Sequence, residues 1–109
     1  MRYAPFAVAT LALALGGAAP VSAASFDCDG AKSELEMTIC GDDGLSGMDE
    51  LMEQAYAGAE VRATTTKSRK TLASDQKAWL KSRAPCAADL GCLIGMYDQR
   101  IEFLNQWMP

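Results

Sequence analysis

The 109-residue chain contains no histidine. Histidine is the usual general base beside a serine or cysteine nucleophile, and its imidazole is a common metal ligand. Its absence argues against triad-type hydrolysis, and it leaves little side-chain charge to change between about pH 5 and pH 8. We therefore predict a protein that is not an enzyme, with no catalytic residue, no metal site and no cofactor.

A glycine-rich phosphate loop is also missing. The carboxylates that could still form an acid–base pair are clustered at Asp42-Asp43 and at Asp49, Glu50 and Glu53. These positions fall at an expected turn and an expected helix start, where capping and solvation account for acidic side chains. A peptidoglycan-acting enzyme that uses these clusters stays open as an alternative.

Positive charge is scarce. The chain has ten basic and fourteen acidic side chains, which gives a formal net charge of −4. Removal of Arg2 with the leader described below would make it −5. Nucleic-acid binding draws on clustered lysine and arginine, so we expect no nucleic-acid partner. An acidic surface would attract a cationic partner, although solubility alone also explains it.

No apolar run is long enough to span a membrane. The longest, Phe6 to Ala19, falls short of the roughly 20 residues that a span requires and is rich in alanine and glycine. It follows Arg2 and precedes Pro20, the order of a secretory signal peptide. A membrane anchor is the alternative.

Small residues at the end of this segment indicate the cleavage site. We predict a signal peptide over residues 1–23, with cleavage after Ala23 or Ala24. No cysteine stands at the new N-terminus to take a lipid. The remaining domain, residues 24–109, is therefore expected in the periplasm or secreted, with no membrane contact after cleavage.

Four cysteines, an even number, lie beyond the predicted signal peptide. In a short exported domain they are expected to form disulfides. Positions along the chain favour Cys28–Cys40 and Cys86–Cys92, while the other two pairings stay open. Neither pair has the two-residue spacing of a thioredoxin-type redox site. A zinc site is not expected either, because the chain has no histidine and the cysteine spacings fit no common zinc motif.

The apolar periodicity is helical and shows no strand alternation. Ser33 and Glu36 predict a capping box for a short first helix, ending at a turn over residues 41–44. We expect Ser46 to cap a second helix, and a turn near residues 64–66 to end it. The second helix carries Leu45, Met48, Leu51, Met52, Ala55, Tyr56 and Ala59.

Two further helices are expected. The third carries Leu72, Gln76, Trp79, Leu80 and Arg83 and stops before Pro85. The fourth carries Leu93, Met96, Tyr97, Ile101 and Leu104 and ends near Trp107. The sequence thus predicts an all-α fold, a small disulfide-stapled helical hairpin or bundle of about four helices.

An ordered set of short strings runs through the mature chain. The first half contains Phe26-Asp27-Cys28, Glu36-Met37-Thr38-Ile39-Cys40, and Leu45-Ser46-Gly47-Met48-Asp49 with Tyr56. The second half contains Gln76-Lys77-Ala78-Trp79-Leu80-Lys81-Ser82-Arg83, Cys86, Cys92-Leu93, and Tyr97-Asp98-Gln99-Arg100-Ile101 with Leu104. This set resembles the LprI-type lysozyme-inhibitor domain. The resemblance implies a small, helical, cysteine-bridged domain exported by bacteria that binds and inhibits lysozyme.

The chain departs from that pattern in two places. Ala84-Pro85 stands where an acidic residue is common, which puts any contact of that acid in doubt. The lipid-attachment cysteine that some members carry behind the signal is missing.

Three charged residues in the matching strings are candidates for binding a partner: Asp49, Arg83 and Arg100. Asp49 could instead pair with either arginine. Arg100 could meet the two catalytic carboxylates of a glycosidase cleft. The aromatic residues Tyr56, Trp79 and Tyr97 are expected in the core.

The sequence therefore predicts an exported binding protein that occludes the active cleft of a lysozyme. The alternative is a periplasmic protein–protein interaction module of the cell envelope with no lysozyme target.

Overall fold

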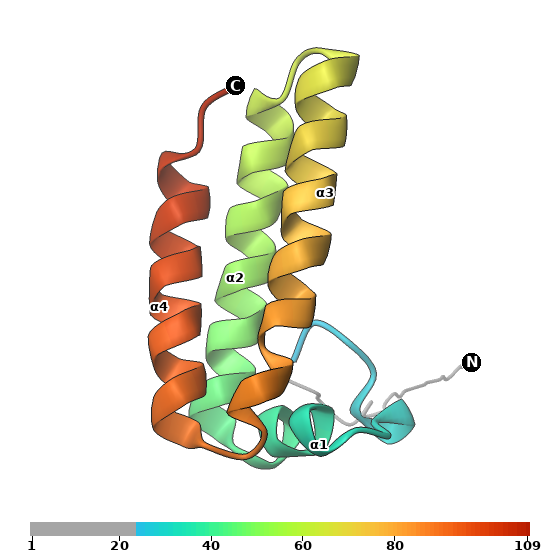
Figure 1. Ribbon diagram of the computed structural model, residues 1–109, viewed down its shortest axis with the longest axis vertical. Helices are drawn as coiled ribbons and strands as arrows, with labels where there is room; N and C mark the ends of the chain where they lie inside the picture. The colour runs from blue at the N-terminus through green and yellow to red at the C-terminus, as the bar shows by residue number, and fades with distance from the viewer. Residues whose placement is uncertain (1–23) are drawn as a thin grey trace, which may run out of the picture.

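The computed structural model describes residues 24–109, and the predicted signal peptide lies outside them. The described residues form four α-helices and two short 3-10 helices, without strands. In chain order these are η1 (Cys28–Gly30), α1 (Glu34–Gly41), α2 (Asp43–Arg62), α3 (Thr66–Ser82), η2 (Ala84–Cys86) and α4 (Leu90–Gln106). The all-α prediction is confirmed. The long helices run up, down and up, while α1 lies across their base (Figure 1).

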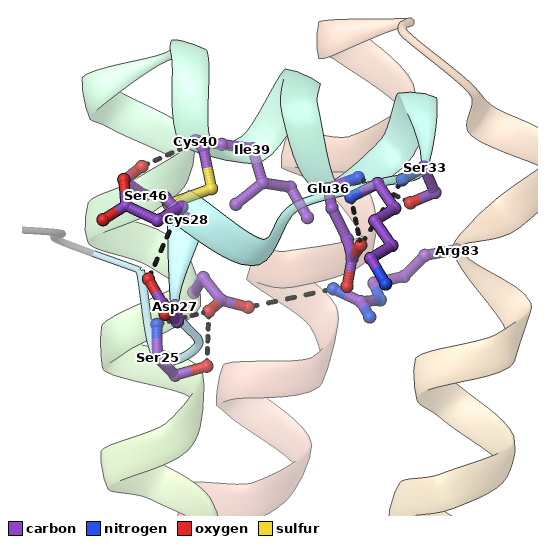
Figure 2. The surroundings of a disulfide bond; sticks show 12 residues. Ser25, Asp27, Cys28, Ser33, Glu36, Ile39, Cys40, Ser46 and Arg83 are labelled. Carbon is purple, nitrogen blue, oxygen red and sulfur yellow. Dashed lines mark hydrogen bonds and ion pairs between the residues drawn. A yellow bond between two sulfur atoms is a disulfide. The ribbon is translucent and has the colours of Figure 1, made fainter.

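The start of α1 follows from its capping box, as predicted. The hydroxyl of Ser33 accepts a hydrogen bond from the backbone N–H of Glu36 at 3.0 Å. The carboxylate of Glu36 accepts the N–H groups of Lys32 and Ser33 (Figure 2). These backbone donors lower the pKa of Glu36, because they stabilise its charged form.

The expected cap of the second helix is wrong. Asp42, in extended conformation, is the residue that separates α1 from α2, and its carboxylate accepts the N–H of Leu45 at 2.9 Å. Because this cap starts α2 at Asp43, Ser46 lies inside the helix and is buried. Its hydroxyl donates instead to the carbonyl of Ile39 at 2.6 Å, which joins the two helices.

The closest packing is between α2 and α4, which run in parallel. Ala55 and Ala59 are buried on α2, and such small side chains let two backbones approach. Leu45, Met52, Leu93 and Leu104 fill the rest of this contact. The predicted stripe on α2 is wrong at Leu51, which is 53% exposed.

Helix α3 packs more loosely, and large side chains lie between it and the other two helices. Of its residues only Leu72 and Gln76 are buried, and Trp79 is half-buried against the core. Leu80, expected on the same apolar face, lies at its edge and is exposed. Most of the surface of α3 therefore faces solvent.

Both favoured disulfides are present. Cys28–Cys40 ties η1 to the end of α1 (Figure 2), and Cys86–Cys92 joins η2 to the first turn of α4. The second closes a short turn in which Ala87 has a φ of 51°, a conformation that residues with a Cβ rarely adopt. The two bridges therefore hold the ends of α1 and α4 at the base of the bundle.

Replacing either cysteine pair by serine should cost about 2–3 kcal/mol of unfolding free energy, because the unfolded chain regains the freedom of an open loop. For a domain of this size the melting temperature should fall by about 10–20 °C. The longer Cys28–Cys40 loop should lose slightly more than the Cys86–Cys92 loop. Thermal melts by circular dichroism with and without reductant measure the effect, and coincident curves would contradict it.

Candidate functional site: a buried polar network

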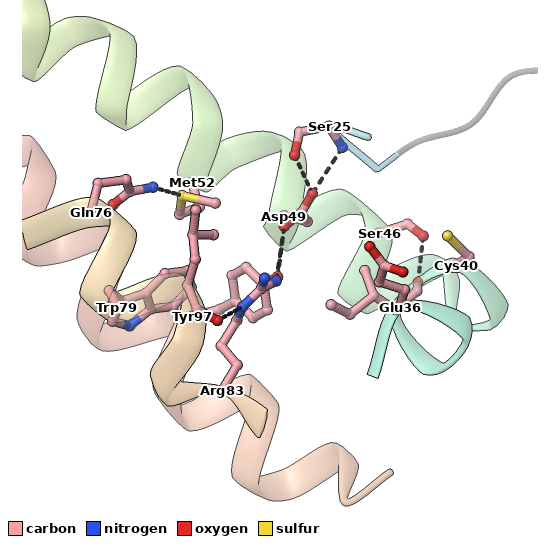
Figure 3. Close-up of polar contacts among 12 residues, drawn as sticks. Ser25, Glu36, Cys40, Ser46, Asp49, Met52, Gln76, Trp79, Arg83 and Tyr97 are labelled. Atoms are coloured by element: carbon pink, nitrogen blue, oxygen red, sulfur yellow. Dashed lines mark hydrogen bonds and ion pairs between the residues drawn. The ribbon is translucent and has the colours of Figure 1, made fainter. Parts of the chain in front are cut away.

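Polar side chains enter the core where α2, α3 and α4 meet. Ser46, Asp49, Gln76 and Arg100 are each at most 7% exposed. A buried polar group is costly unless it is hydrogen-bonded, so the partners of these side chains define what this centre does. Ser46 bonds to Ile39, and the other three belong to two groups, one around Asp49 and one around Gln76. Figure 3 shows the group around Asp49 and, apart from it, the contact of Gln76 with Met52.

Asp49 is the centre of the first group. Its side chain is 1% exposed, and both carboxylate oxygens accept hydrogen bonds. One oxygen accepts the backbone N–H of Ser25 at 2.8 Å and its hydroxyl at 2.5 Å, while the other accepts the hydroxyl of Tyr97 at 2.6 Å (Figure 3). A single carboxylate on α2 thus joins the N-terminal segment and α4.

Tyr97 is fully buried and connects Asp49 to Arg83. Its hydroxyl accepts a hydrogen bond from Nη1 of Arg83 at 2.7 Å while donating to Asp49. Burial raises the pKa of the Tyr97 phenol, and the hydrogen bond to Asp49 raises it further, because the carboxylate favours the protonated hydroxyl. The ring also meets Trp79 edge to face at a centroid distance of 5.2 Å.

Arg83 supplies the positive charge of this group. Nη1 of Arg83 lies 3.8 Å from the Asp49 carboxylate, and its side chain is 12% exposed. Nε donates to the carbonyl of Leu80 at 3.0 Å, which caps the end of α3. The guanidinium lies over the rings of Trp79 and Tyr97. Arg83 therefore closes the core at the base of α3.

Arg100 belongs to the second group and does not reach Asp49. Of the two arginines expected to pair with Asp49, Arg83 is therefore confirmed and Arg100 is wrong. It donates through Nε and Nη2 to the side-chain carbonyl of Gln76, at 3.0 and 2.8 Å. Nη2 also pairs with the carboxylate of Asp75 at 2.7 Å. The amide of Gln76 in turn donates to the sulfur of Met52. Helices α3 and α4 are joined here because α3 presents adjacent residues to one guanidinium.

Sequence reasoning missed the roles of Ser25, Asp75 and Gln76. A signal existed for Gln76, since a polar amide stands on the apolar stripe between Leu72 and Trp79. No local pattern marks Ser25, whose partner lies 24 residues away. Asp75 is half exposed and looks like any solvated acid.

The predicted carboxylate clusters are used in the fold. Asp42 caps α2, and Asp49 is saturated with donors. Burial raises the pKa of Glu53, and the carboxylates of Asp49, Glu60 and Glu50 raise it further.

Within residues 24–109 there is no group of three or more cysteines and acids that could hold a metal ion. None of the described helices is long and apolar enough to cross a membrane.

The three binding candidates therefore lie in the interior of the bundle. Asp49 has no free oxygen, Arg83 faces Tyr97, and Arg100 is held by Gln76 and Asp75. A direct contact of these residues with a partner stays a prediction. Their geometry positions the helices on which a contact surface must be built.

Tyr97→Phe should lower the free energy of unfolding by about 1–3 kcal/mol. The ring stays packed, but Asp49 loses a donor and Arg83 loses an acceptor inside the core. Urea denaturation measures the change. Tyr56→Phe is the matched control, because this half-buried tyrosine on α2 has no hydroxyl hydrogen bond among the described residues. The control should stay within about 0.5 kcal/mol of the parent protein, and an equal loss in both variants would contradict the role of the hydroxyl.

The raised pKa of Tyr97 also predicts a pH dependence. An unfolded tyrosine loses its proton near its ordinary pKa of 10.0, whereas folded Tyr97 keeps it. The stabilisation is therefore complete below about pH 10 and is lost as the pH rises further, because the unfolded state alone releases the proton. The difference in unfolding free energy between the parent and Tyr97→Phe should be constant up to about pH 9.5 and should narrow as the pH rises from about 10 to 11.5. A constant difference over that range would be inconsistent with this assignment.

Comparison with known families agrees with the earlier resemblance. A family model described as lysozyme inhibitor LprI matches residues 28–104, a span that includes all four cysteines and nearly every described helical residue. No curated protein and no solved structure matches the chain. Because the family model covers well over half of the sequence, the chain belongs to the LprI lysozyme inhibitor family.

Proposed function

We propose that this protein is exported to the periplasm or beyond, where it inhibits a lysozyme by occluding its active cleft. The observation that carries the proposal is the family match over residues 28–104. Occlusion requires a rigid surface and no chemistry of its own. The two disulfides and the buried network around Asp49 supply that rigidity.

The surface suited to a protein partner lies on α2 and α4, on the side away from α3. Leu51 on α2 is 53% exposed and Ile94 on α4 is 41% exposed. By helical periodicity both stand beside the α2–α4 contact, on the flank opposite to the side chains that meet α3. We call this surface the outer face, and it comprises Met48, Leu51, Leu90, Ile94, Asp98, Ile101 and Glu102.

Acidic side chains extend the outer face. Asp98 lies four residues after Ile94, and Glu102 lies eight residues after it. Both acids are exposed on α4. An uncovered apolar centre beside exposed charge is the usual composition of a protein-binding patch. Many lysozymes are cationic, so acids at this position would steer and orient the encounter.

Charge is distributed unevenly over the molecule. Residues 24–109 hold nine basic and fourteen acidic side chains, and α3 alone has five of the basic ones with a single acid. The rest of the domain therefore has four basic and thirteen acidic side chains, a formal charge of −9. The negative charge that would attract a cationic enzyme is therefore concentrated on the part of the domain outside α3, and this part includes the outer face.

The purified, oxidised protein should slow the clearing of a peptidoglycan suspension by a cationic lysozyme at micromolar concentration. Inhibition should weaken as salt rises from about 20 mM to 500 mM, because screening shortens the reach of the acidic surface. Turbidity measures both effects. No slowing at any salt concentration would overturn the proposal, and a different envelope protein captured by the outer face would favour the interaction-module alternative.

The same assay tests the contact surface. Leu51→Lys and Ile94→Lys should each raise the inhibitor concentration needed for half inhibition by about tenfold, since a charge replaces apolar contact area. Val61→Lys is the matched control, because Val61 is an 80% exposed apolar residue on α2 outside the outer face. Equal losses in all three variants would assign the effect to net charge and contradict the outer face as the contact.

A further inference from the structure

Lysine and arginine are used in different ways in this protein. Three of the arginines donate hydrogen bonds that hold the fold: Arg62 to carbonyls at the end of α4, Arg83 to Tyr97, and Arg100 to Gln76. Four of the five lysines in the chain stand on α3 instead, and all four are exposed. Guanidinium groups suit fixed hydrogen-bond geometry, whereas an ammonium on a flexible stem acts as a mobile point charge.

The four lysines share one face of the helix. Lys67, Lys70, Lys77 and Lys81, with Ser74 between them, follow the three- and four-residue spacing of a single stripe. With a rise of 1.5 Å per residue, the stripe is about 21 Å long. We call these four residues the lysine stripe.

The stripe faces directly away from the core. Lys70 comes two residues before buried Leu72, and Lys77 comes two residues before half-buried Trp79. Two residues are roughly half a helical turn, so each lysine points opposite to the packed side. Helix α3 stands at one edge of the three long helices (Figure 1). The stripe lies on the side of α3 opposite to its buried residues, Leu72 and Gln76.

No acid neutralises the stripe. Neither ion pair among the described residues includes a lysine, and Asp75, the single acid on α3, is held by Arg100. The pairs Lys67–Lys70 and Lys77–Lys81 place like charges at neighbouring positions on the helix surface, which disfavours an isolated helix. Four unpaired positive charges therefore lie in a row on a domain that is otherwise strongly acidic.

We infer that the lysine stripe docks the protein onto an anionic phospholipid surface. The stripe is straight and outward-facing, so all four ammonium groups can meet one plane at the same time. Each lysine near an anionic bilayer contributes about fivefold in partitioning, so four together give about 600-fold at low salt. This strength gives reversible association rather than permanent anchoring.

Other anionic ligands fit the stripe less well. A small anion needs a pocket with converging donors, whereas the hollow beside the stripe, lined by Lys70, Thr71, Ser74, Asp75 and Ala78, is open and contains a carboxylate. A flexible polyanion would tend to wrap past α3, and the net charge of −9 on the rest of the domain would repel it. No aromatic side chain lies along the stripe to stack on nucleic-acid bases.

The inference departs from the expectation that the mature chain has no membrane contact. That expectation rested on cleavage of the signal peptide and on the missing lipid-attachment cysteine. It did not consider how charge is distributed, and the net charge averages over two parts of opposite sign. Docking through α3 would leave the outer face of α2 and α4 pointing away from the membrane. The inference does not depend on lysozyme inhibition, because it rests on the lysine stripe alone.

Cosedimentation with lipid vesicles tests the inference. The oxidised protein should bind vesicles of phosphatidylcholine containing about 40% phosphatidylglycerol at low salt, and it should not bind pure phosphatidylcholine. Binding should disappear by about 0.5 M salt, because no apolar side chain on the stripe inserts into the bilayer. Equal binding to both kinds of vesicle, or binding that survives high salt, would overturn the inference.

Variants isolate the stripe. Replacing all four lysines by glutamine should weaken vesicle binding by at least 100-fold and leave the melting temperature unchanged or slightly higher, since glutamine has similar helix propensity and removes like-charge repulsion. Replacing them by arginine should keep binding. Lys32→Gln, which changes the one lysine outside α3, is the matched control and should keep it too. Full binding by the glutamine variant, or binding of soluble polyphosphate with no vesicle binding, would refute a membrane-docking stripe.

Inhibition of lysozyme in solution provides an independent readout. The glutamine variant should inhibit as well as the parent protein when no membrane is present. Loss of vesicle binding with inhibition intact would support the inference, whereas loss of inhibition with unchanged vesicle binding would assign the stripe to the enzyme contact and overturn it. A protein that binds vesicles through the stripe but never inhibits lysozyme would refute the proposed function alone.

Discussion

The buried carboxylate of Asp49 needs donors that its own helix cannot supply. Within an α-helix the backbone N–H groups already donate to backbone carbonyls, so the donors for Asp49 must come from other segments. Ser25 and Tyr97 provide them, and Arg83 adds a positive charge at the edge of the group. Taking away any one partner leaves a polar atom without water in the core, which is why three distant segments are held in one arrangement.

The disulfides and this network restrain different parts of the molecule. Cys28–Cys40 fixes the segment that follows Ser25, and Cys86–Cys92 fixes the turn between Arg83 and the helix that carries Tyr97. Each bridge is local in sequence, whereas the hydrogen bond between Tyr97 and Asp49 spans 48 residues. Local cross-links thus reduce the freedom of the ends, while long-range polar contacts, from Tyr97 to Asp49 and from Arg62 to the end of α4, join α2 to α4.

A rigid body of this kind can present different surfaces in different directions. The acids gather on the helices around Asp49, and the lysines gather on α3, because α3 packs through few side chains and leaves its outer side free. We propose that one side of the domain meets a cationic enzyme and that another meets an anionic membrane. A net charge alone would describe neither side.

Helical periodicity, the capping box at Ser33, and both cysteine pairings could be predicted from sequence, because each depends on residues within about one or two helical turns or within a short loop. The expected cap at Ser46 was wrong for a local reason, because Asp42 starts the helix earlier. At Leu51 and in the pairing of Arg100, the answer depended on which helix face met which neighbour. That choice is made by side chains up to 48 residues apart, which no local pattern encodes. The sequence by itself therefore determined the helices and their staples, while only the tertiary structure decided which charges are buried in the core and which remain on the surface.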